Sequence, residues 1–181
     1  MMPSFLTISR CRPDEFGDIY AVINEAAVVY RGVIAADRWK EPYMPAHELR
    51  DEIAAGVVFW GAYDEDGKLA GVMGLQHVGG VALIRHAYTR PATQGRGVGS
   101  ALLARLRELT ERPMLIGTWR DAEWAVRFYV GRGFTLASDD EKMRLLNEYW
   151  TVPQRQITES VVLVDERFIR GRDSAVSQSM A

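Results

Sequence analysis

The sequence predicts a single α/β domain with a mixed, mostly antiparallel sheet, and three observations support this fold class. Apolar runs of strand length, such as residues 81–88, alternate with apolar stripes at helical spacing, such as residues 102–109. Two strong turn sequences, at residues 64–67 and 79–80, join three consecutive strands into a meander. The third strand then enters a glycine-rich loop that opens a helix, so helices and strands belong to one layered unit.

Composition and charge exclude several classes of protein. The chain has 181 residues, 48% of them hydrophobic, and a net charge of -2, so no nucleic-acid partner is indicated. The single cysteine, Cys11, excludes a disulfide within the chain and gives no basis for a cysteine metal site. With no signal peptide in residues 1–12 and no apolar run of bilayer length, we expect a cytoplasmic protein without a membrane partner.

The first third of the chain predicts a strand and two helices. A short strand ends near Arg10, and Pro13 opens a helix that Gly32 ends. Residues 33–45 hold two prolines and two aromatic residues, which is typical of a loop. A short helix then stops at Gly56.

The rest of the chain alternates strands with helices. We expect strands at 57–63, 69–78, 81–89, 114–118, 134–137 and 158–164. We expect helices from the glycine loop to about 111, from a cap at Asp121 to Gly131, and over 140–150. One domain is therefore predicted over residues 1–170, followed by a disordered C-terminal tail over 171–181.

The glycine-rich loop is the most informative stretch. Gly95, Gly97 and Gly99 remove side chains that would block a ligand, and glycine accepts positive φ. Backbone N–H groups could then converge on an anion at the positive end of the helix, with Arg96 as a further donor. A simple turn is the alternative interpretation. A Walker loop is excluded because the loop has no lysine, and the spacing does not fit a dinucleotide fingerprint.

Two motifs indicate a family. Gln94, Gly97 and Gly99 fit the pattern Gln/Arg-x-x-Gly-x-Gly/Ala, which resembles the acyl-CoA pyrophosphate motif of the GNAT superfamily of N-acetyltransferases. Residues 125–129, Ala-Val-Arg-Phe-Tyr, followed by Gly-Phe at 133–134, resemble a second GNAT motif. The order of predicted elements over residues 4–165 is also similar to the GNAT fold.

The resemblance implies a fold, a cosubstrate and a site. It implies a GNAT-type sheet with a V-shaped splay between two central parallel strands, and transfer of an acetyl group from acetyl-CoA to a primary amine of a small molecule or peptide. Backbone groups of Ala87 and Thr89 would hold pantetheine, Tyr129 would be the general acid, and no metal is expected. The pyrophosphate would contact the loop residues Gln94, Gly95, Arg96, Gly97, Val98, Gly99 and Ser100.

Two positions depart from the family pattern. An asparagine that often contacts the cosubstrate is replaced by Ala122. No general base is assigned, because strand alternation turns Leu83 and Arg85 toward the cleft and His86 away from it, unless a bulge re-aims the histidine. His86 is therefore interpreted as a core or helix-facing histidine.

The sequence does not determine which acceptor is used, or whether the protein is an enzyme. Aromatic and acidic groups between Tyr30 and Tyr43 suit a cationic amine, whereas Arg31 and Arg38 suit a carboxylate. A non-catalytic acyl-CoA-binding module on the same fold is an alternative. A protein-interaction domain is another, with a hydrophobic dimer surface at Trp119, Trp124 and Trp150. A homodimer is an expectation from the family.

Overall fold

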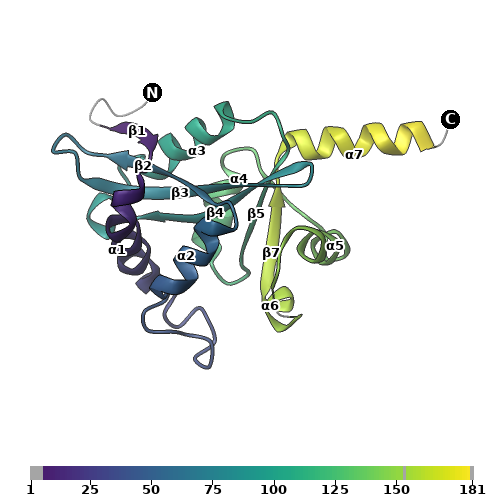
Figure 1. Ribbon diagram of the computed structural model, residues 1–181. Helices are drawn as coiled ribbons and strands as arrows, with labels where there is room; N and C mark the ends of the chain where they lie inside the picture. Colours follow the sequence, from purple (N-terminus) through teal and green to yellow (C-terminus); the bar gives the residue numbers. More distant parts are fainter. Residues whose placement is uncertain (1–5, 153, 180–181) are drawn as a thin grey trace. The chain divides into compact units, whose positions relative to one another are not determined.

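A computed structural model describes residues 6–152 and 154–179 of the chain (Figure 1). The chain divides into two compact units. Unit 1 comprises Met1–Gln76 and Ile84–Glu111, and unit 2 comprises His77–Leu83 and Arg112–Ala181. The expectation of one domain over residues 1–170 stays a prediction.

The secondary structure follows the predicted alternation closely. The strands are β1 (Thr7–Arg10), β2 (Val58–Tyr63), β3 (Leu69–Val78), β4 (Val81–Thr89), β5 (Met114–Trp119), β6 (Thr135–Leu136) and β7 (Ser160–Val164). The α-helices are α1 (Phe16–Ala26), α2 (Ala46–Ala54), α3 (Val98–Glu108), α4 (Glu123–Val130), α5 (Asp139–Tyr149), α6 (Gln154–Glu159) and α7 (Glu166–Ser179). Three short 3₁₀ helices are η1 (Pro13–Glu15), η2 (Ala27–Tyr30) and η3 (Pro91–Thr93).

The sheet is mixed and mostly antiparallel, which confirms the predicted fold class. Its strands follow the order β1-β2-β3-β4-β5-β7-β6, with β4 and β5 as the parallel pair. β4 begins in unit 2, where the Ala82 amide donates to the Pro113 carbonyl at 2.8 Å, and it ends in unit 1.

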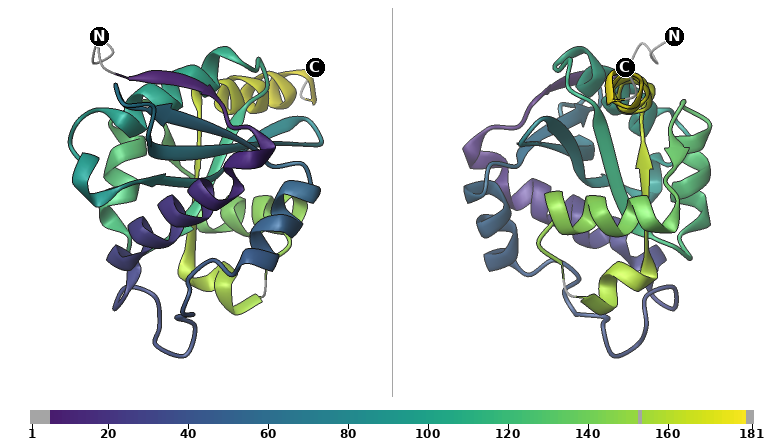
Figure 2. Two further views of the ribbon diagram at one scale, coloured as in Figure 1. Left: turned by 60° about the vertical axis from the view of Figure 1, so that its left-hand side comes forward. Right: turned by 90° about the vertical axis from the view of Figure 1, so that its right-hand side faces the viewer.

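In unit 1, helices cover both faces of the meander (Figure 2). Ile19 and Ile23 of α1 and Leu49 of α2 are buried in one core cluster with Phe59 of β2. Neighbouring side chains of a strand point to opposite faces. Trp60 accordingly meets α3 on the other face, where the Arg105 guanidinium lies 5.3 Å from the indole ring.

A glycine sets how closely α3 approaches the meander. A Cβ at Gly71 of β3 would lie 2.7 Å from Cγ1 of Val98 and 3.0 Å from the carbonyl oxygen of Tyr88. Cβ atoms are essentially never found so close to another atom. The first turn of α3 can therefore pack this closely only because residue 71 of β3 is a glycine. The lack of a side chain at Gly71 therefore allows the start of α3 and the end of β4 to lie close to β3.

In unit 2, α5 and α6 share a core with β5 and β7 that includes Leu115, Leu145, Ile157 and Val162. The N-terminus of α5 is capped by the Ser138 hydroxyl, which accepts from the Glu141 amide at 3.2 Å. No side chain caps α4, so the predicted Asp121 cap is wrong: the N-cap residue is Ala122.

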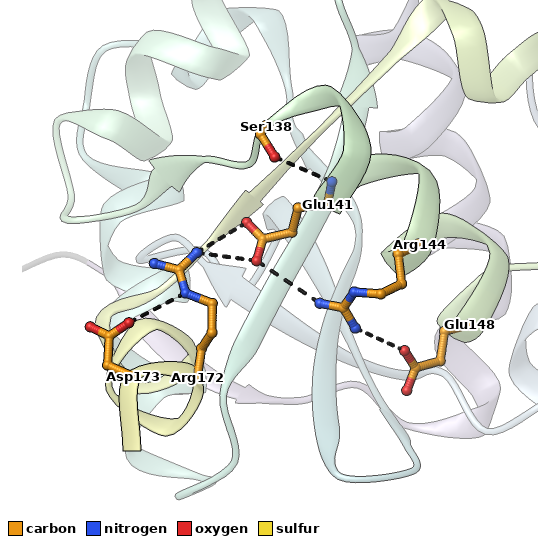
Figure 3. A network of polar contacts seen from close by, with 6 residues as sticks. All are labelled: Ser138, Glu141, Arg144, Glu148, Arg172 and Asp173. Atoms are coloured by element: carbon orange, nitrogen blue, oxygen red, sulfur yellow. Dashed lines mark hydrogen bonds and ion pairs between the residues drawn. The ribbon is translucent and has the colours of Figure 1, made fainter. Parts of the chain in front are cut away.

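Most of the disordered tail predicted over residues 171–181 is helical in the structure, and residues 180–181 lie outside the described residues. Residues 171–179 continue α7, which follows β7 directly. Arg172 of this helix contacts both carboxylate oxygens of Glu141 at 3.2 and 3.4 Å, and Arg144 links Glu141 to Glu148 (Figure 3). These ion pairs give a polar helix a partner on α5, which composition alone does not reveal. Among the described residues, no helix has the length and apolar character needed to cross a membrane.

The only cysteine lies in a polar cluster of unit 1. The Tyr63 hydroxyl donates to Glu15 at 3.0 Å and lies 3.6 Å from the Cys11 Sγ. Burial, partly offset by the contact with Tyr63 and reinforced by the charge of Glu15, raises the pKa of Cys11 to about 11. The thiol is therefore protonated at neutral pH and unsuited to act as a nucleophile.

We expect the Gly71→Ala variant to lose stability by about 1–3 kcal/mol, the usual cost of overpacking. In a domain of this size, that loss lowers the melting midpoint by roughly 2–4 °C per kcal/mol. Gly80→Ala is the control, because a Cβ there meets nothing within 4 Å. Equal midpoints for the two variants in thermal melts would refute the close approach of α3.

A second prediction concerns the thiol. At pH 8, a pKa of about 11 leaves the thiolate of Cys11 about 200-fold scarcer than in a free cysteine. Alkylation by iodoacetamide, followed by mass spectrometry, should therefore be at least that much slower in the native protein than in urea. Equal rates would contradict the buried, protonated state.

Candidate functional site

The glycine loop leaves the end of β4 and is tied to β3 at its base. The Arg90 amide donates to the Ala70 carbonyl at 2.9 Å, and the Thr93 hydroxyl donates to the same carbonyl at 3.0 Å. The Arg90 side chain adds a hydrogen bond to the Leu69 carbonyl at 2.7 Å and an ion pair with Glu25. The loop therefore starts from a fixed point.

Two glycines of the loop have backbone conformations that favour glycine. Gly95 has φ +76° and Gly97, the N-cap of α3, has φ +81°. A Cβ at Gly95 would meet nothing within 4 Å, so this glycine serves the turn and leaves the space above it open. The sequence prediction that these positions need glycine is supported by both φ values.

The start of α3 presents backbone donors. The Ala101 amide donates to the carbonyl of Gly97, the N-cap residue, at 2.9 Å, and this is the first hydrogen bond of the helix. Helix geometry gives the amides of Val98 and Gly99 no acceptor one turn back. Because the helix dipole is positive at this end, an anion in front of these amides would be stabilised.

The side chains of the loop divide by exposure. Val98 is buried against β3, whereas Gln94 and Arg96 are exposed. Arg96 lines a surface hollow with Asp64, Glu65 and Asp66 of the turn between β2 and β3. All of the residues predicted to hold the pyrophosphate, 94–100, lie in unit 1.

The other predicted site residues lie on β4 and α4. Ala87 and Thr89 are half-buried near the end of β4, directly before the loop. Tyr129 belongs to unit 2, where its buried ring packs edge-on against Phe128 and Phe134 at centroid distances of 4.9 and 5.6 Å. The Phe134 amide donates to the Tyr129 carbonyl at 3.1 Å, which fixes the second motif as one compact turn.

Three tyrosines of unit 1 form a cluster that the sequence anticipated only in part. Tyr30 and Tyr43 stack at 6.0 Å, and Tyr88 of β4 meets both edge-on at 6.2 Å. We call these three residues the tyrosine cluster. Each ring is half-buried, so the cluster keeps part of its aromatic surface accessible. The sequence analysis named Tyr30 and Tyr43 but not Tyr88, because a strand pattern does not tell which loop a side chain meets.

Two charged residues beside the cluster, Arg31 and Glu41, pair with each other. The Arg31 guanidinium pairs with Glu41 and lies 5.4 Å from the ring of Trp39, whose indole N–H donates to Glu41 at 3.1 Å. The hydrogen bonds from Trp39 and then Arg31 hold the pKa of Glu41 below its usual value. Arg31 is therefore already matched by a carboxylate of its own chain.

The alternation predicted for β4 fails at His86. This residue has φ +50°, and both it and Arg85 reach Glu52 of α2. The Arg85 guanidinium binds Glu52 at 2.7 Å and Gln76 at 2.8 Å, and His86 Nε2 lies 3.4 Å from Glu52. Burial alone would raise the pKa of Glu52, but His86 and Arg85 outweigh it and keep the pKa below its usual value.

No group of three or more acidic, histidine or cysteine side chains that could hold a metal ion occurs among the residues described. The arrangement offers backbone donors at the start of α3, a partly exposed aromatic cluster, and a carboxylate–imidazole contact between α2 and β4.

Comparison with protein families finds a match to the acetyltransferase (GNAT) domain over residues 55–136, a span that contains the glycine loop and Tyr129. No curated protein matches the chain by sequence. The domain match extends from the end of α2 to β6.

Solved structures with a similar fold include enzymes in complex with coenzyme A and acetyltransferases of the GNAT family. The PaiA N-acetyltransferase from Thermoplasma acidophilum in complex with coenzyme A has a TM-score of 0.67 and 17% identity, over 88% of this chain and 98% of that one. A GNAT acetyltransferase from Staphylococcus aureus has the same TM-score and coverage at 13% identity. The N-acetylglutamate synthase from Neisseria gonorrhoeae, complexed with coenzyme A and L-arginine, has a TM-score of 0.55 and 22% identity, over 90% of this chain and 33% of that one. At these identities the likeness shows the fold, and with the domain match it confirms the resemblance to the GNAT superfamily.

Proposed function

We propose that this chain, which matches the GNAT acetyltransferase domain over residues 55–136, moves an acetyl group from acetyl-CoA to a primary amine of a small molecule or peptide. The observation that carries the proposal is the loop of residues 94–100. It combines two left-handed glycines, open space above Gly95 and the amides at the start of α3. These are the features that a pyrophosphate needs.

The cosubstrate side of the proposal rests on the residues of unit 1. Amides of residues 95–100 would hold the pyrophosphate, with Gln94 and Arg96 as exposed donors at its edges. Backbone groups of Ala87 and Thr89 would hold the pantetheine arm as a further strand would. The coenzyme A present in the Thermoplasma and Neisseria structures supports this assignment.

Tyr129 is the proposed general acid. The amine nitrogen forms a bond to the thioester carbonyl carbon, and the carbon–sulfur bond breaks when the tetrahedral intermediate collapses. The Tyr129 hydroxyl gives its proton to the leaving sulfur and regains one from the new amide nitrogen. A phenol with a pKa of ~10 keeps its proton until a thiolate forms, because the thiol pKa is only ~8.5. The remaining acceleration comes from holding amine and thioester together.

The tyrosine cluster is the proposed acceptor side. Aromatic faces attract a cationic amine, and Tyr88 lies between Ala87 and Thr89 on β4, so the cluster begins where the pantetheine arm would end. Arg31 already has a carboxylate partner, Glu41, which favours an amine over a carboxylate-bearing acceptor at that residue, while Arg38 keeps the carboxylate alternative open.

The runner-up is a non-catalytic module that binds acyl-CoA on the same fold. The replacement of the family asparagine by Ala122, which is completely buried, favours it. Release of free thiol from acetyl-CoA with any amine would exclude this alternative.

We expect acetyl-CoA at ~100 times its dissociation constant to stabilise the protein by ~2.7 kcal/mol. The Gly97→Glu variant should lose this shift, because a carboxylate and a strained φ replace the open N-terminus of α3. Gly79→Glu is the matched control: it carries the same charge at another positive φ, and its Cβ makes only an ordinary contact with Tyr149. Thermal melts with acetyl-CoA, and with ATP as a negative control, make the measurement. An undiminished shift in Gly97→Glu would show that the loop is not the cradle.

We also expect Tyr129→Phe to reduce turnover by roughly 10²–10⁴-fold, the usual range for loss of an acid–base group. Its acetyl-CoA melting shift should match that of the wild type, because no part of the loop is altered. Free-thiol release with a panel of primary amines measures the rate. Full turnover in this variant would remove Tyr129 from the mechanism.

A further inference from the structure

The proposed acceptor side of unit 1 is walled by aromatic rings from three segments of the chain. Tyr30 ends η2, Tyr43 lies in the loop before α2, and Tyr88 belongs to β4. These three rings form the tyrosine cluster, and Trp39 extends it, since its ring lies 5.7 Å from that of Tyr43. All four rings are half-buried, so each keeps part of its surface accessible. The chain therefore presents a continuous aromatic surface here rather than isolated rings.

Asn24 of α1 holds the loop that carries Tyr43. The Met44 amide donates to Asn24 Oδ1 at 2.8 Å, and Asn24 Nδ2 donates to the carbonyls of Met44 at 3.1 Å and Tyr20 at 3.0 Å. The side-chain amide thus pairs with both backbone groups of Met44, as a residue of a neighbouring strand would. The Met44 side chain is itself buried in the core of unit 1. Its neighbour Tyr43 is therefore held in the cluster without any ligand.

Two carboxylates of this loop and of the helix that follows it already have cationic partners. Glu41 pairs with Arg31 and accepts from the Trp39 indole. Glu48 of α2 pairs with Lys40 at 2.5 Å. A second ammonium group on an acceptor would have to compete with these partners for either carboxylate, and aromatic faces alone attract an exposed cation only weakly. The surface therefore favours a ring over a second cation.

The reaction also requires that the reacting nitrogen does not rest on the tyrosines. Aromatic faces stabilise an ammonium ion, so an amine held on them would stay protonated and could not attack the thioester. Tyr88 lies between Ala87 and Thr89, and each residue of a strand advances by about 3.3 Å. A ligand ring on the cluster would therefore lie beside the stretch proposed to hold the pantetheine arm, and the amine attached to it could reach the thioester.

We propose that the acceptor carries an aromatic ring close to its primary amine, that the tyrosine cluster binds this ring, and that Asn24 is the positioning residue that keeps Tyr43 in the cluster. The inference rests on the proposed function and names the class of its acceptor. Aromatic rings prefer offset-stacked or edge-on contacts, which add to the gain from burial alone. The cluster already contains both, a stacked pair and two edge-on contacts, so a ligand ring would extend an existing arrangement.

The first test compares phenethylamine with 2-cyclohexylethylamine, which has a ring of similar size but no aromatic face. We expect wild-type kcat/KM, referred to the neutral fraction of each amine, to be roughly 2–10-fold higher for phenethylamine, the gain that an aromatic contact adds beyond burial. Tyr43→Leu should lose most of this ratio, because leucine keeps an apolar contact but has no ring. Tyr149→Leu, the same change at a half-buried tyrosine of unit 2, is the control and should keep the ratio.

Asn24→Asp tests the positioning role. Its carboxylate accepts from the Met44 amide but cannot donate to the carbonyls of Met44 and Tyr20. We expect KM for phenethylamine to rise, while KM for n-butylamine and the acetyl-CoA melting shift stay unchanged because neither depends on the cluster. Ser138→Ala, which removes the cap of α5, controls for lost stability and should leave both KM values unchanged. An unchanged KM for phenethylamine in Asn24→Asp would overturn the positioning role.

Equal use of the two ring-bearing amines by the wild type, or an undiminished ratio in Tyr43→Leu, would overturn this inference and leave the proposed function standing. A preference for cadaverine, which offers a second ammonium group, or for β-alanine, which offers a carboxylate, would overturn it as well. A wild-type protein that releases no thiol from acetyl-CoA with any of these amines would overturn the proposed function, and this inference with it.

Discussion

A β-strand can direct consecutive side chains to one side only where its backbone leaves the extended region, and the organisation of β4 depends on such a break. The positive φ of His86 lets Arg85 and His86 share the single carboxylate of Glu52. Beyond the break, Tyr88 reaches the aromatic residues that follow α1. The C-terminal half of β4 therefore directs Arg85 and His86 to the same carboxylate, whereas a regular strand would turn them to opposite faces.

Much of the fold could be predicted from the sequence, because turns, strands and helix ends are indicated by residues close together in the chain. The glycines at 95 and 97 indicated a turn at the start of a helix, and both have positive φ in the structure. Apolar periodicity identified the meander and the helices that cover it. The left-handed Gly56 ends α2 as predicted.

The remaining features depend on contacts between distant residues. Glu52 gave no signal, because a glutamate on a helix is ordinarily solvated, and only the fold brings it to β4. The positive φ at His86 could not be predicted, because the residue there is not a glycine. The α7 helix was missed because its polar composition is typical of a tail, while the charge that helps to hold it lies on α5, at Glu141. Tyr129 was named from its motif, and its ring is buried between two phenylalanines as a core aromatic would be.

The acidic turn between β2 and β3 has a consequence for selectivity. Asp64, Glu65 and Asp66 border the same hollow as Arg96, so three carboxylates lie beside the guanidinium of the loop. A flexible polyanion attracted only by net charge would gain little here. An anion would have to be recognised by amide geometry at short range, and its affinity would depend only weakly on ionic strength. If the loop binds an anion as proposed, these carboxylates would favour ligands that fit the amide geometry over ligands attracted by charge alone.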